Sequence, residues 1–470
     1  MKRNTIRLLA LMISSFSLSQ DLSIKNNLRV DDDFNSEGIL HFKPANTNSQ
    51  LDSLQLKYNH YTLQNGLEVI LQPDKNVNEV SVEFWIRDGT AIDNPNEYGL
   101  QHFFEHVMPY NKMDSVSKKV FFDSYLKGSN AQVKKDFSRF YLKVIPEGIN
   151  LALERASGRL IAGANAITEN RIEYERKKVL LEIKRNAKNP HWSAEGSLAI
   201  SEGTFGKGHP YAANGYGKLE NNRAFSVNDF KRRYEEIIFS ENIILFVVGN
   251  FDMSRVKKLV HQYFSKVESK KRLVNEVSKH IVPSNDGISM KTSHQNDSLN
   301  TMVFSWAIPN YQLKDDAVLR LISAHLNNSF KAKNYFPFTV IKSGAYADMY
   351  KTAGQFHLRI QFPNANDSIQ IEKFILGRIK RLVKKNLTVR DLGLAKESEI
   401  MDIKEMRENL GFQWSRTALL GESLLYYDNP NAYFERLQIQ QGLTAKQVRK
   451  VFKKWMVPKP FRILFSPNIE

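Results

Sequence analysis

The chain contains no cysteine among its 470 residues, which excludes disulfide bonds, cysteine-ligated zinc sites and thiol nucleophiles. Its stability must come from burial of a core. Long apolar runs are also missing, because no stretch beyond the first residues approaches the roughly twenty apolar residues that a membrane-spanning helix needs. We therefore expect no stable membrane span.

Clustered positive charge is a third absence. The formal net charge is +17, from 67 Lys and Arg against 50 Asp and Glu, but the basic residues are spread along the chain. There is no basic tail, zinc knuckle or aromatic RNA-binding signature, so we expect no nucleic-acid partner. A composition of 42% hydrophobic and 25% charged residues predicts a globular protein of roughly two to four domains.

The first nineteen residues have the layout of a secretory signal peptide. They open with basic residues, continue with an apolar run at residues 8–13 and end with small residues at Ser17 and Ser19. Cleavage after Ser19 would direct the chain to the periplasm, although an extracellular destination stays open. A mitochondrial transit peptide is the less favoured alternative, because the segment is free of acidic residues but its apolar block is compact.

Alternating strand and helix patterns follow this segment. Residues 20–55 are polar and predict a flexible leader. Asn65-Gly66 lies between alternating apolar and polar residues, which predicts a β-hairpin. Helical patterns cover residues 148–162 and 168–189, and the run IILFVVG from residue 243 predicts a buried strand.

The order strand, loop, helix recurs in the second half. LNTMVFSWAIPNYQLKDDAVLRLISAHLNN is similar in layout to NEVSVEFWIRDGTAIDNPNEYGLQHFFEHV, and setting Trp306 against Trp85 predicts two copies of one unit. The expected fold class is α+β, with two homologous α/β lobes, each a mostly antiparallel or mixed sheet covered by helices. The expected boundaries are a signal peptide at 1–19, a leader at 20–55, a first lobe at 56–270, a linker at 271–295 and a second lobe at 296–470.

The stretch GLQHFFEHV, residues 99–107, places two histidines and a glutamate within one helical turn. Residues three and four apart share one face of a helix, so His102, Glu105 and His106 project together. Two imidazoles at this spacing can bind one cation such as zinc, and a catalytic zinc site needs a third protein ligand and an open position. Under the alternative interpretation both histidines are core or rim residues, and a five-residue motif alone does not decide against it.

The helix predicted at residues 168–189 offers a third ligand. Its inward stripe includes Glu175 and Glu182 among apolar residues, and buried carboxylates are costly without a counter-charge. A divalent cation is such a counter-charge, so either glutamate could complete the site. Alternatively, both lie at the edge of the stripe and pair with Lys178 or Arg185.

Several segments together resemble a known family. H-x-x-E-H is the inverted form of the common zinc-peptidase motif, and the chain resembles the pitrilysin or insulinase-like zinc metallopeptidases, which include mitochondrial processing peptidase. The matching segments, in the family's order, are LQNGLEVIL, GLQHFFEH, GSNAQVKKDFSRFYLKVIPEGINLALE, ERKKVLLEI, HPYAANGYGK and IILFVVGNFD. The resemblance implies a catalytic, metal-binding first lobe and a non-catalytic, substrate-binding second lobe that form half of a clam-shell chamber.

The resemblance also implies a set of site residues. One zinc ion per chain would be bound by His102, His106 and Glu182. Glu105 would be the catalytic base that takes the proton of a water at the zinc, and Glu175 a supporting residue that orients a histidine or restrains Glu182. The implied activity is that of an exported zinc-dependent endopeptidase, which hydrolyses peptides or unfolded polypeptides bound as an added strand.

Departures from the family pattern concern the substrate. Asn130 belongs to the Asn-Ala pair that lies near bound substrate in the family, but Val133 replaces the usual Thr, and an upstream Glu of the family is replaced near Asp93. Active members often hold substrate with an Arg and a Tyr. SGAYAD offers Tyr346, whereas HLNNSFKAKNYF has only lysines near the place of the Arg.

Two alternative functions stay open. Because a partner could supply the missing Arg, the chain could be a non-catalytic or partner-dependent subunit of a peptidase heterodimer. It could also be a subunit of a mitochondrial-type processing peptidase. We expect a homodimer or a heterodimer with a related subunit.

Overall fold

A computed structural model describes residues 51–109, 113–213, 215–272, 289–294, 299–332 and 334–467. The expected signal peptide, nearly all of the expected leader and part of the expected linker lie outside the described residues. The domain boundaries given above therefore stay predictions.

The first half of the chain builds a six-stranded mixed sheet with the order β1-β2-β6-β3-β5-β4. The strands are β1 (Asn59–Thr62), β2 (Glu68–Pro73), β3 (Val80–Ile86), β4 (Leu126–Val133), β5 (Ser138–Val144) and β6 (Ile243–Gly249). β1 and β2 form the predicted hairpin, and its turn contains Gly66 with a left-handed φ of 92°. β2 and β6 are parallel, the other neighbours are antiparallel, and β4 forms a free edge.

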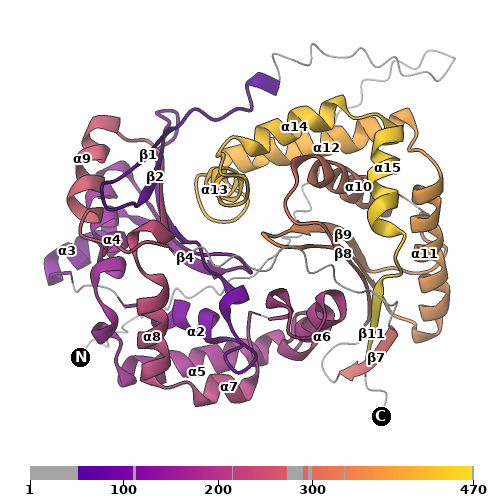
Figure 1. Ribbon diagram of the computed structural model, residues 1–470, viewed down its shortest axis with the longest axis horizontal. Coiled ribbons are helices and arrows are strands. Elements are labelled where there is room, and N and C mark those ends of the chain that lie inside the picture. The colour runs from indigo at the N-terminus through magenta and orange to yellow at the C-terminus, as the bar shows by residue number, and fades with distance from the viewer. Residues whose placement is uncertain are drawn as a thin grey trace, which may run out of the picture.

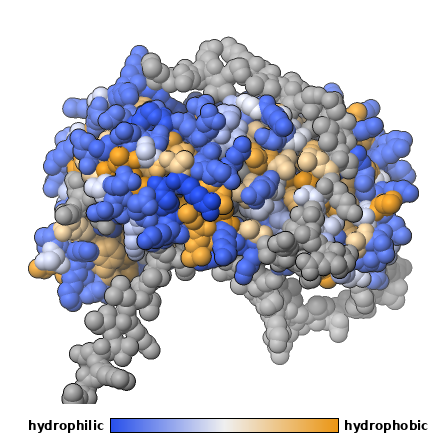
Figure 2. All heavy atoms as spheres, turned by 90° about the horizontal axis from the view of Figure 1, so that it is seen from below, coloured by the Kyte–Doolittle hydropathy of each residue, from blue (hydrophilic) through white to orange (hydrophobic). Residues whose placement is uncertain are grey.

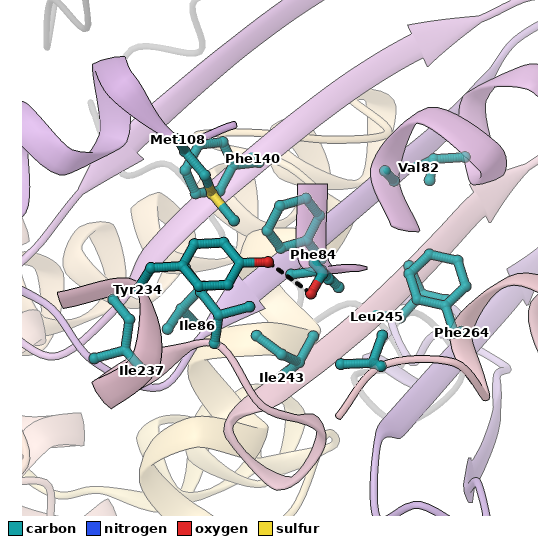
Figure 3. Packing of buried hydrophobic residues seen from close by; sticks show 14 of the residues in the cluster. Val82, Phe84, Ile86, Met108, Phe140, Tyr234, Ile237, Ile243, Leu245 and Phe264 are labelled. Carbon is teal, nitrogen blue, oxygen red and sulfur yellow. Dashed lines mark hydrogen bonds between the residues drawn. The ribbon is translucent and has the colours of Figure 1, made fainter. Parts of the chain in front are cut away.

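Helices cover the outer face of this sheet. They include α2 (Leu100–Val107), α4 (Ile149–Ile161), α5 (Glu169–Asn186), α7 (Leu219–Ala224), α8 (Val227–Ile237) and α9 (Met253–Phe264), with α3 (Ser115–Val120) further out. The remaining helix of the first half, α6 (Ala194–Phe205), lies beside the second sheet. Figure 3 shows the core beneath α8, where Tyr234 and Ile237 lie close to Ile86 and Ile243. Each large apolar side chain buried here contributes roughly 1.5–3 kcal/mol.

The second half repeats the same strand pairing. Its five-stranded sheet has the order β7-β11-β8-β10-β9, with one parallel pair followed by antiparallel neighbours, as in the series β2-β6-β3-β5-β4. The strands are β7 (Ser289–His294), β8 (Asn300–Ile308), β9 (Lys342–Met349), β10 (Gly354–Phe362) and β11 (Phe461–Pro467). The prediction of an α+β fold with two homologous lobes is confirmed. β7 lies within residues 271–295, the range that the sequence assigned to a linker. This strand was not predicted, because SMKTSH lacks an apolar pattern.

The helices of the second half pack on one face of its sheet. α10 (Leu313–Lys331), α11 (Ser368–Lys384) and α15 (Ala445–Met456) share a core with apolar residues of β8 and β10. The remaining helices are α12 (Val389–Glu408), α13 (Arg416–Tyr427) and α14 (Ala432–Gly442). α12 and α14 contribute to that core and also to a cluster with the first sheet, whereas the buried apolar residues of α13 belong to the cluster with the first sheet.

Each half lends helices to the other half's sheet (Figure 1). The inner face of the first sheet, including Trp85 and Phe246, packs on Leu420 of α13 and Phe434 of α14. Conversely, the face of the second sheet that lies opposite its own helices packs on α6 from the first half. The two sheets are thereby held together by shared cores.

The outer surface is largely polar on the face that Figure 2 shows, with apolar side chains in scattered patches. Among the described residues, no helix has the length and apolar content that crossing a membrane requires.

Candidate metal centre

Helix α2 carries the H-x-x-E-H motif, and its apolar side chains fix it against the core. Phe103, Phe104 and Val107 are fully buried, and the ring of Phe103 meets Phe230 of α8 edge to face with centroids 4.8 Å apart. This packing turns the opposite side of the helix toward α5.

The N-terminus of α2 is held by a buried ion pair. The carboxylate of Asp93 accepts hydrogen bonds from the backbone N–H groups of Gly99 and Gln101, both at 3.2 Å. Arg233 donates to Asp93 at 2.7 Å and to the Gln101 side chain at 2.9 Å. Asp93 therefore caps and orients the helix that carries the motif.

Two arginines bind the carbonyl groups at the C-terminus of α2. Arg171 of α5 donates to the carbonyl oxygens of His106 and Val107 at 3.0 and 3.1 Å, and Arg159 of α4 donates to that of Met108 at 3.2 Å. Their positive charges also complement the negative end of the helix dipole. A helix of eight residues is thus fixed at both ends.

His102, His106 and Glu182 converge between α2 and α5. One ligand atom from each lies within 4.8 Å of the other two. Oε2 of Glu182 is 3.9 Å from Nε2 of His102 and 3.6 Å from Nε2 of His106. The structure therefore brings together the three residues predicted to bind metal.

Helix α5 turns two glutamates toward the protein interior, as the position of its apolar stripe predicted. Thr168 caps the helix, Ile172 and Val179 are fully buried, and Glu175 and Glu182 are only 3% and 6% exposed. Oε2 of Glu175 lies 3.7 Å from Nδ1 of His106, and Lys178 contacts the same carboxylate at 3.1 Å. The lysine pairing considered from the sequence therefore occurs at Glu175, alongside the contact with His106.

The surroundings shift the pKa values of the two histidines in opposite directions. Burial lowers the pKa of His102 to about 4, so its imidazole is neutral, the form that binds metal. Burial acts to lower the pKa of His106 as well, but the carboxylates of Glu175, Glu182 and Glu105 outweigh it and raise that pKa to about 10. The cluster therefore attracts one positive charge at the point where the three side chains meet.

Glu105 lies on the same face of α2 and is kept from ionising easily. Burial raises its pKa to about 7, an effect that the nearby Glu182 reinforces and that His106 and Arg159 oppose. Its Oε2 atom is buried and has no hydrogen-bond partner among the described residues. A carboxyl group with a pKa near 7 can both accept and return a proton.

The donor set fits a zinc ion. Two imidazoles and one carboxylate are the ligands of several catalytic zinc sites, and Glu182 Oε1 and His102 Nδ1 are buried atoms without hydrogen-bond partners in the described part of the chain. Such unsatisfied polar atoms are rare in folded proteins and need an explanation. A bound cation would supply the missing counter-charge for Glu182.

Tyr216 is a neighbour of the cluster to which sequence reasoning assigned no role. Its ring meets that of His102 edge to face at 5.2 Å. Two glycines with left-handed φ allow its loop to approach α2: a Cβ at Gly99 would lie 2.7 Å from the carbonyl oxygen of Tyr216, and one at Gly217 only 1.8 Å from that of Tyr98. The sequence GYGK contains Tyr216 and one of these glycines, but their role depends on the close approach of the loop to α2, which the sequence alone does not show.

A cavity of about 610 Å³ opens beside the cluster. It is lined by His102 and Tyr216, by the end of edge strand β4, by η5 (Pro190–Trp192) and α6, and by β9 and α13 of the second half. Charged residues of both signs line it: Lys134, Lys135, Arg139, Arg320, Arg436, Asp348, Glu399, Asp402 and Glu422. The metal cluster therefore faces a space that both halves enclose.

The two predicted substrate-binding residues lie on the edge strands of the two sheets. Asn130 is in β4, and its side chain accepts a hydrogen bond from the N–H of Ala131 at 2.9 Å. Tyr346 is in β9 and is 36% exposed. Its hydroxyl accepts from Arg359 of β10 at 3.3 Å, so a guanidinium does accompany the tyrosine, from a strand that sequence reasoning did not consider.

Among the described residues of the second half, no counterpart of the metal cluster is found. Ser323 and Asn327, which stand opposite His102 and His106 when Trp306 is set against Trp85, instead bind the backbone of β9. Asn327 donates to the carbonyl of Ala345 at 2.9 Å and accepts from its N–H at 2.8 Å, and Ser323 donates to the same carbonyl. This face of α10 therefore has a structural role.

Two family models match the chain. The model described as "Insulinase (Peptidase family M16)" matches residues 68–204, which include the whole His102, His106 and Glu182 cluster. The model described as "Peptidase M16 inactive domain" matches residues 224–399. The division agrees with the presence of a metal cluster in the first half and its replacement in the second.

Comparisons with individual proteins agree with the two family models. An uncharacterized zinc protease of Bacillus subtilis, YmxG, is 26% identical over 215 residues, which are 45% of this chain and 50% of that protein. Insulin-degrading enzyme of Bos taurus is 25% identical over 236 residues, 48% of this chain and 22% of that protein. The matched region thus spans half or less of these relatives. A solved structure of a protease from Helicobacter pylori aligns with a TM-score of 0.76 at 17% identity, covering 88% of this chain and all of that one.

Proposed function

The chain belongs to the M16, or insulinase, family of peptidases, and we propose that it is a zinc-dependent endopeptidase acting on peptides or unfolded polypeptides. The observation that carries this proposal is the convergence of His102, His106 and Glu182 on the face of α2 that also carries Glu105, with His102 lining the cavity. A non-catalytic subunit would not need to keep this set, and the described residues of the part that matches the inactive-domain model contain no such set.

In the proposed mechanism, His102, His106 and Glu182 bind one zinc ion, which when bound would polarise the scissile carbonyl and acidify water. Glu105 accepts the proton of the attacking water on its carboxylate and returns it to the leaving amine, a task that suits its pKa near 7. Glu175, whose Oε2 lies 3.7 Å from Nδ1 of His106, would orient that ring by its negative charge. The arginines at the end of α2 keep both histidines in place.

We further propose that the substrate lies as an extended strand along β4, next to Asn130, because β4 is an edge strand of the sheet that the described residues form. The opposite wall includes Ala347, Asp348 and Met349 of β9, the strand of the second half that carries Tyr346. Export to the periplasm and a dimeric state are parts of the same proposal and rest on the sequence of the first nineteen residues and on the family resemblance. A subunit of a processing peptidase is the alternative.

The proposal is tested by substituting Glu105→Gln, which removes the base but no metal ligand. Cleavage of a mixed peptide library should fall at least about 100-fold, because a positioned general base contributes roughly 10²–10⁴ in rate. Zinc content, measured by atomic absorption, should stay at one ion per chain. His102→Ala and Glu182→Ala should lose both cleavage and zinc.

A matched control is Glu173→Gln, since Glu173 lies on the same helix as Glu182 but its side chain is exposed and pairs with Arg176. This variant should cleave and bind zinc as the wild type does. Undiminished cleavage by Glu105→Gln would refute the catalytic assignment. Wild-type zinc occupancy in both His102→Ala and Glu182→Ala would refute the ligand set.

A further inference from the structure

The loop between α12 and α13, residues 409–415, has an unusual backbone. Phe412 and Trp414 adopt left-handed φ values of 69° and 53°. This conformation costs free energy for any residue with a side chain, and bulky residues are rarely found in it. Such positions persist only where the surrounding structure holds them, and they gather at functional sites.

Buried groups of the first half hold Phe412 in place. Its N–H donates to Oε2 of Glu83 at 2.8 Å, and its carbonyl oxygen accepts from Arg139 at 3.0 Å. Both of these charged residues are buried, and the guanidinium of Arg139 lies 4.9 Å from the ring centroid of Phe412. The backbone and the ring of Phe412 therefore both have partners, which accounts for its strained conformation.

Trp414 has no comparable set of partners. Its carbonyl oxygen accepts from Asn409 at 3.1 Å, but the side chain is 48% exposed. Within the described part of the chain, its indole N–H has no hydrogen-bond partner and no other aromatic ring packs on it. Leaving half of a tryptophan in water forgoes much of the stabilisation that its burial would give. The fold therefore holds this ring in a strained and half-exposed position.

The exposed ring belongs to the wall of the cavity. Trp414 and the preceding Gln413 line the same cavity as His102 of the metal cluster. The apolar residues that line it from the two helices joined by the loop are Ile403, Met406, Ala418 and Leu419. Nε2 of Gln413 is buried and has no hydrogen-bond partner among the described residues. A bound peptide offers the carbonyl oxygen that this donor lacks.

Arg139 connects the loop to the proposed path of the substrate. Besides the carbonyl of Phe412, it donates to Oε1 of Gln132. Gln132 belongs to β4, lies two residues from Asn130 and lines the cavity. A polypeptide that lies along β4 is therefore brought close to the loop that carries Trp414.

We propose that Trp414 is the platform of a subsite that binds an aromatic side chain of the substrate polypeptide. Stacking on the indole adds to the gain from burying apolar surface. A cationic side chain can also lie over an indole, but the apolar residues of the adjoining helices favour an aromatic one, since a charge pays for desolvation. This inference rests on the proposed function in taking a polypeptide as the ligand.

Binding is measured separately from cleavage, with the zinc-loaded Glu105→Gln protein. The ligands are peptides of small neutral residues in which a single Phe is moved through the sequence, and each competes with the same labelled peptide. At one position Phe should tighten binding at least about tenfold relative to the parent peptide, because burial and stacking act together. A second set with Lys in place of Phe tests the cationic alternative.

Adding Trp414→Ala should abolish the preference for Phe and leave one zinc ion per chain, whereas Trp414→Phe should retain part of the preference. Phe122→Ala is the matched control, because Phe122 is 41% exposed but does not line the cavity. It should leave the preference unchanged.

Equal affinity for the Phe peptides and their parent in the Glu105→Gln protein overturns the inference without any further variant. A stronger preference for Lys than for Phe, or a preference that survives Trp414→Ala, overturns it as well. Selective binding by a wild type that cleaves nothing would defeat the proposed function and leave the subsite standing.

Discussion

At the scale of single residues, burial sets the ionisation of the metal cluster. His102 loses its proton because it is buried, His106 keeps one because carboxylates surround it, and Glu105 is poised near neutrality. A zinc ion can bind His106 only through a lone pair that the proton occupies. Metal and proton therefore compete for the same atom.

Zinc uptake should release about one proton near pH 7. The pKa of His106 in the cluster is about 10, so the residue is protonated at pH 7 and must lose that proton on binding. Zinc affinity should then rise as the pH increases from 7 toward 10. Calorimetric titration in buffers of different ionisation enthalpy measures the proton count, and a binding enthalpy that is the same in all buffers would contradict the prediction.

His209 provides a pH test outside the metal site. Burial and the nearby Lys135 lower its pKa to about 4, and its Nδ1 accepts from the N–H of Tyr211 at 3.0 Å. A histidine whose pKa is lower in the folded state than in the unfolded state stabilises the fold at pH values above its unfolded-state pKa of about 6.5. This stabilisation is lost as the pH falls from 6.5 toward 4. At pH 5 the loss from this residue reaches about 2 kcal/mol.

His209→Asn should remove this part of the acid sensitivity, because the Asn oxygen can accept the same hydrogen bond but does not titrate. Urea unfolding of wild type and variant should give similar stabilities at pH 7 and favour the variant at pH 5. His261→Asn, on α9, is the control, since that position is exposed. Identical pH profiles for His209→Asn and the wild type would contradict the prediction.

At the scale of elements, α2 and α5 show what a sequence pattern can and cannot predict. The spacing of His102 and His106 and the stripe with Glu182 predicted both helices and their facing sides, because 3.6-residue periodicity is a local property. The groups that position α2 come from distant residues. Asp93 appeared only as a departure from a family pattern, and nothing in the local sequence of Arg233 indicates its ion pair with Asp93.

Arg171 is expected to couple the two helices. Arg171→Met removes donors to the carbonyls of His106 and Val107, and should lower the free energy of unfolding by about 1–2 kcal/mol and weaken zinc binding. Lys177→Met, at an exposed position of α5, is the control and should change neither. Chemical denaturation and zinc competition with a chelator measure the two effects. Loss of stability with unchanged zinc affinity would show that Arg171 does not position the histidines.

At the scale of the whole molecule, the repeat of strand pairing could be predicted but the exchange of helices could not. Setting Trp306 against Trp85 indicated two copies of one unit, and both sheets have that common topology. Which helices cover which sheet depends on contacts more than 300 residues apart, such as the hydrogen bond from Thr417 to Glu83 at 2.7 Å. Apolar stripes on α13 and α14 show that these helices are buried, but not against which partner.

The exchange of helices predicts one cooperative unfolding transition. A fragment ending at residue 272 would expose Trp85, Ile244 and Phe246, which α13 and α14 cover in the whole chain. Such a fragment, and the complementary one, should fail to fold, as judged by far-ultraviolet circular dichroism and binding of a hydrophobic dye. Leu420→Ala should destabilise the whole chain by about 2–5 kcal/mol, whereas Val389→Ala, at a site that is 92% exposed, should have little effect. Two separate transitions in the full chain, with Leu420→Ala shifting only one, would show that the shared cores do not couple the halves, and the cavity between them would then be free to open.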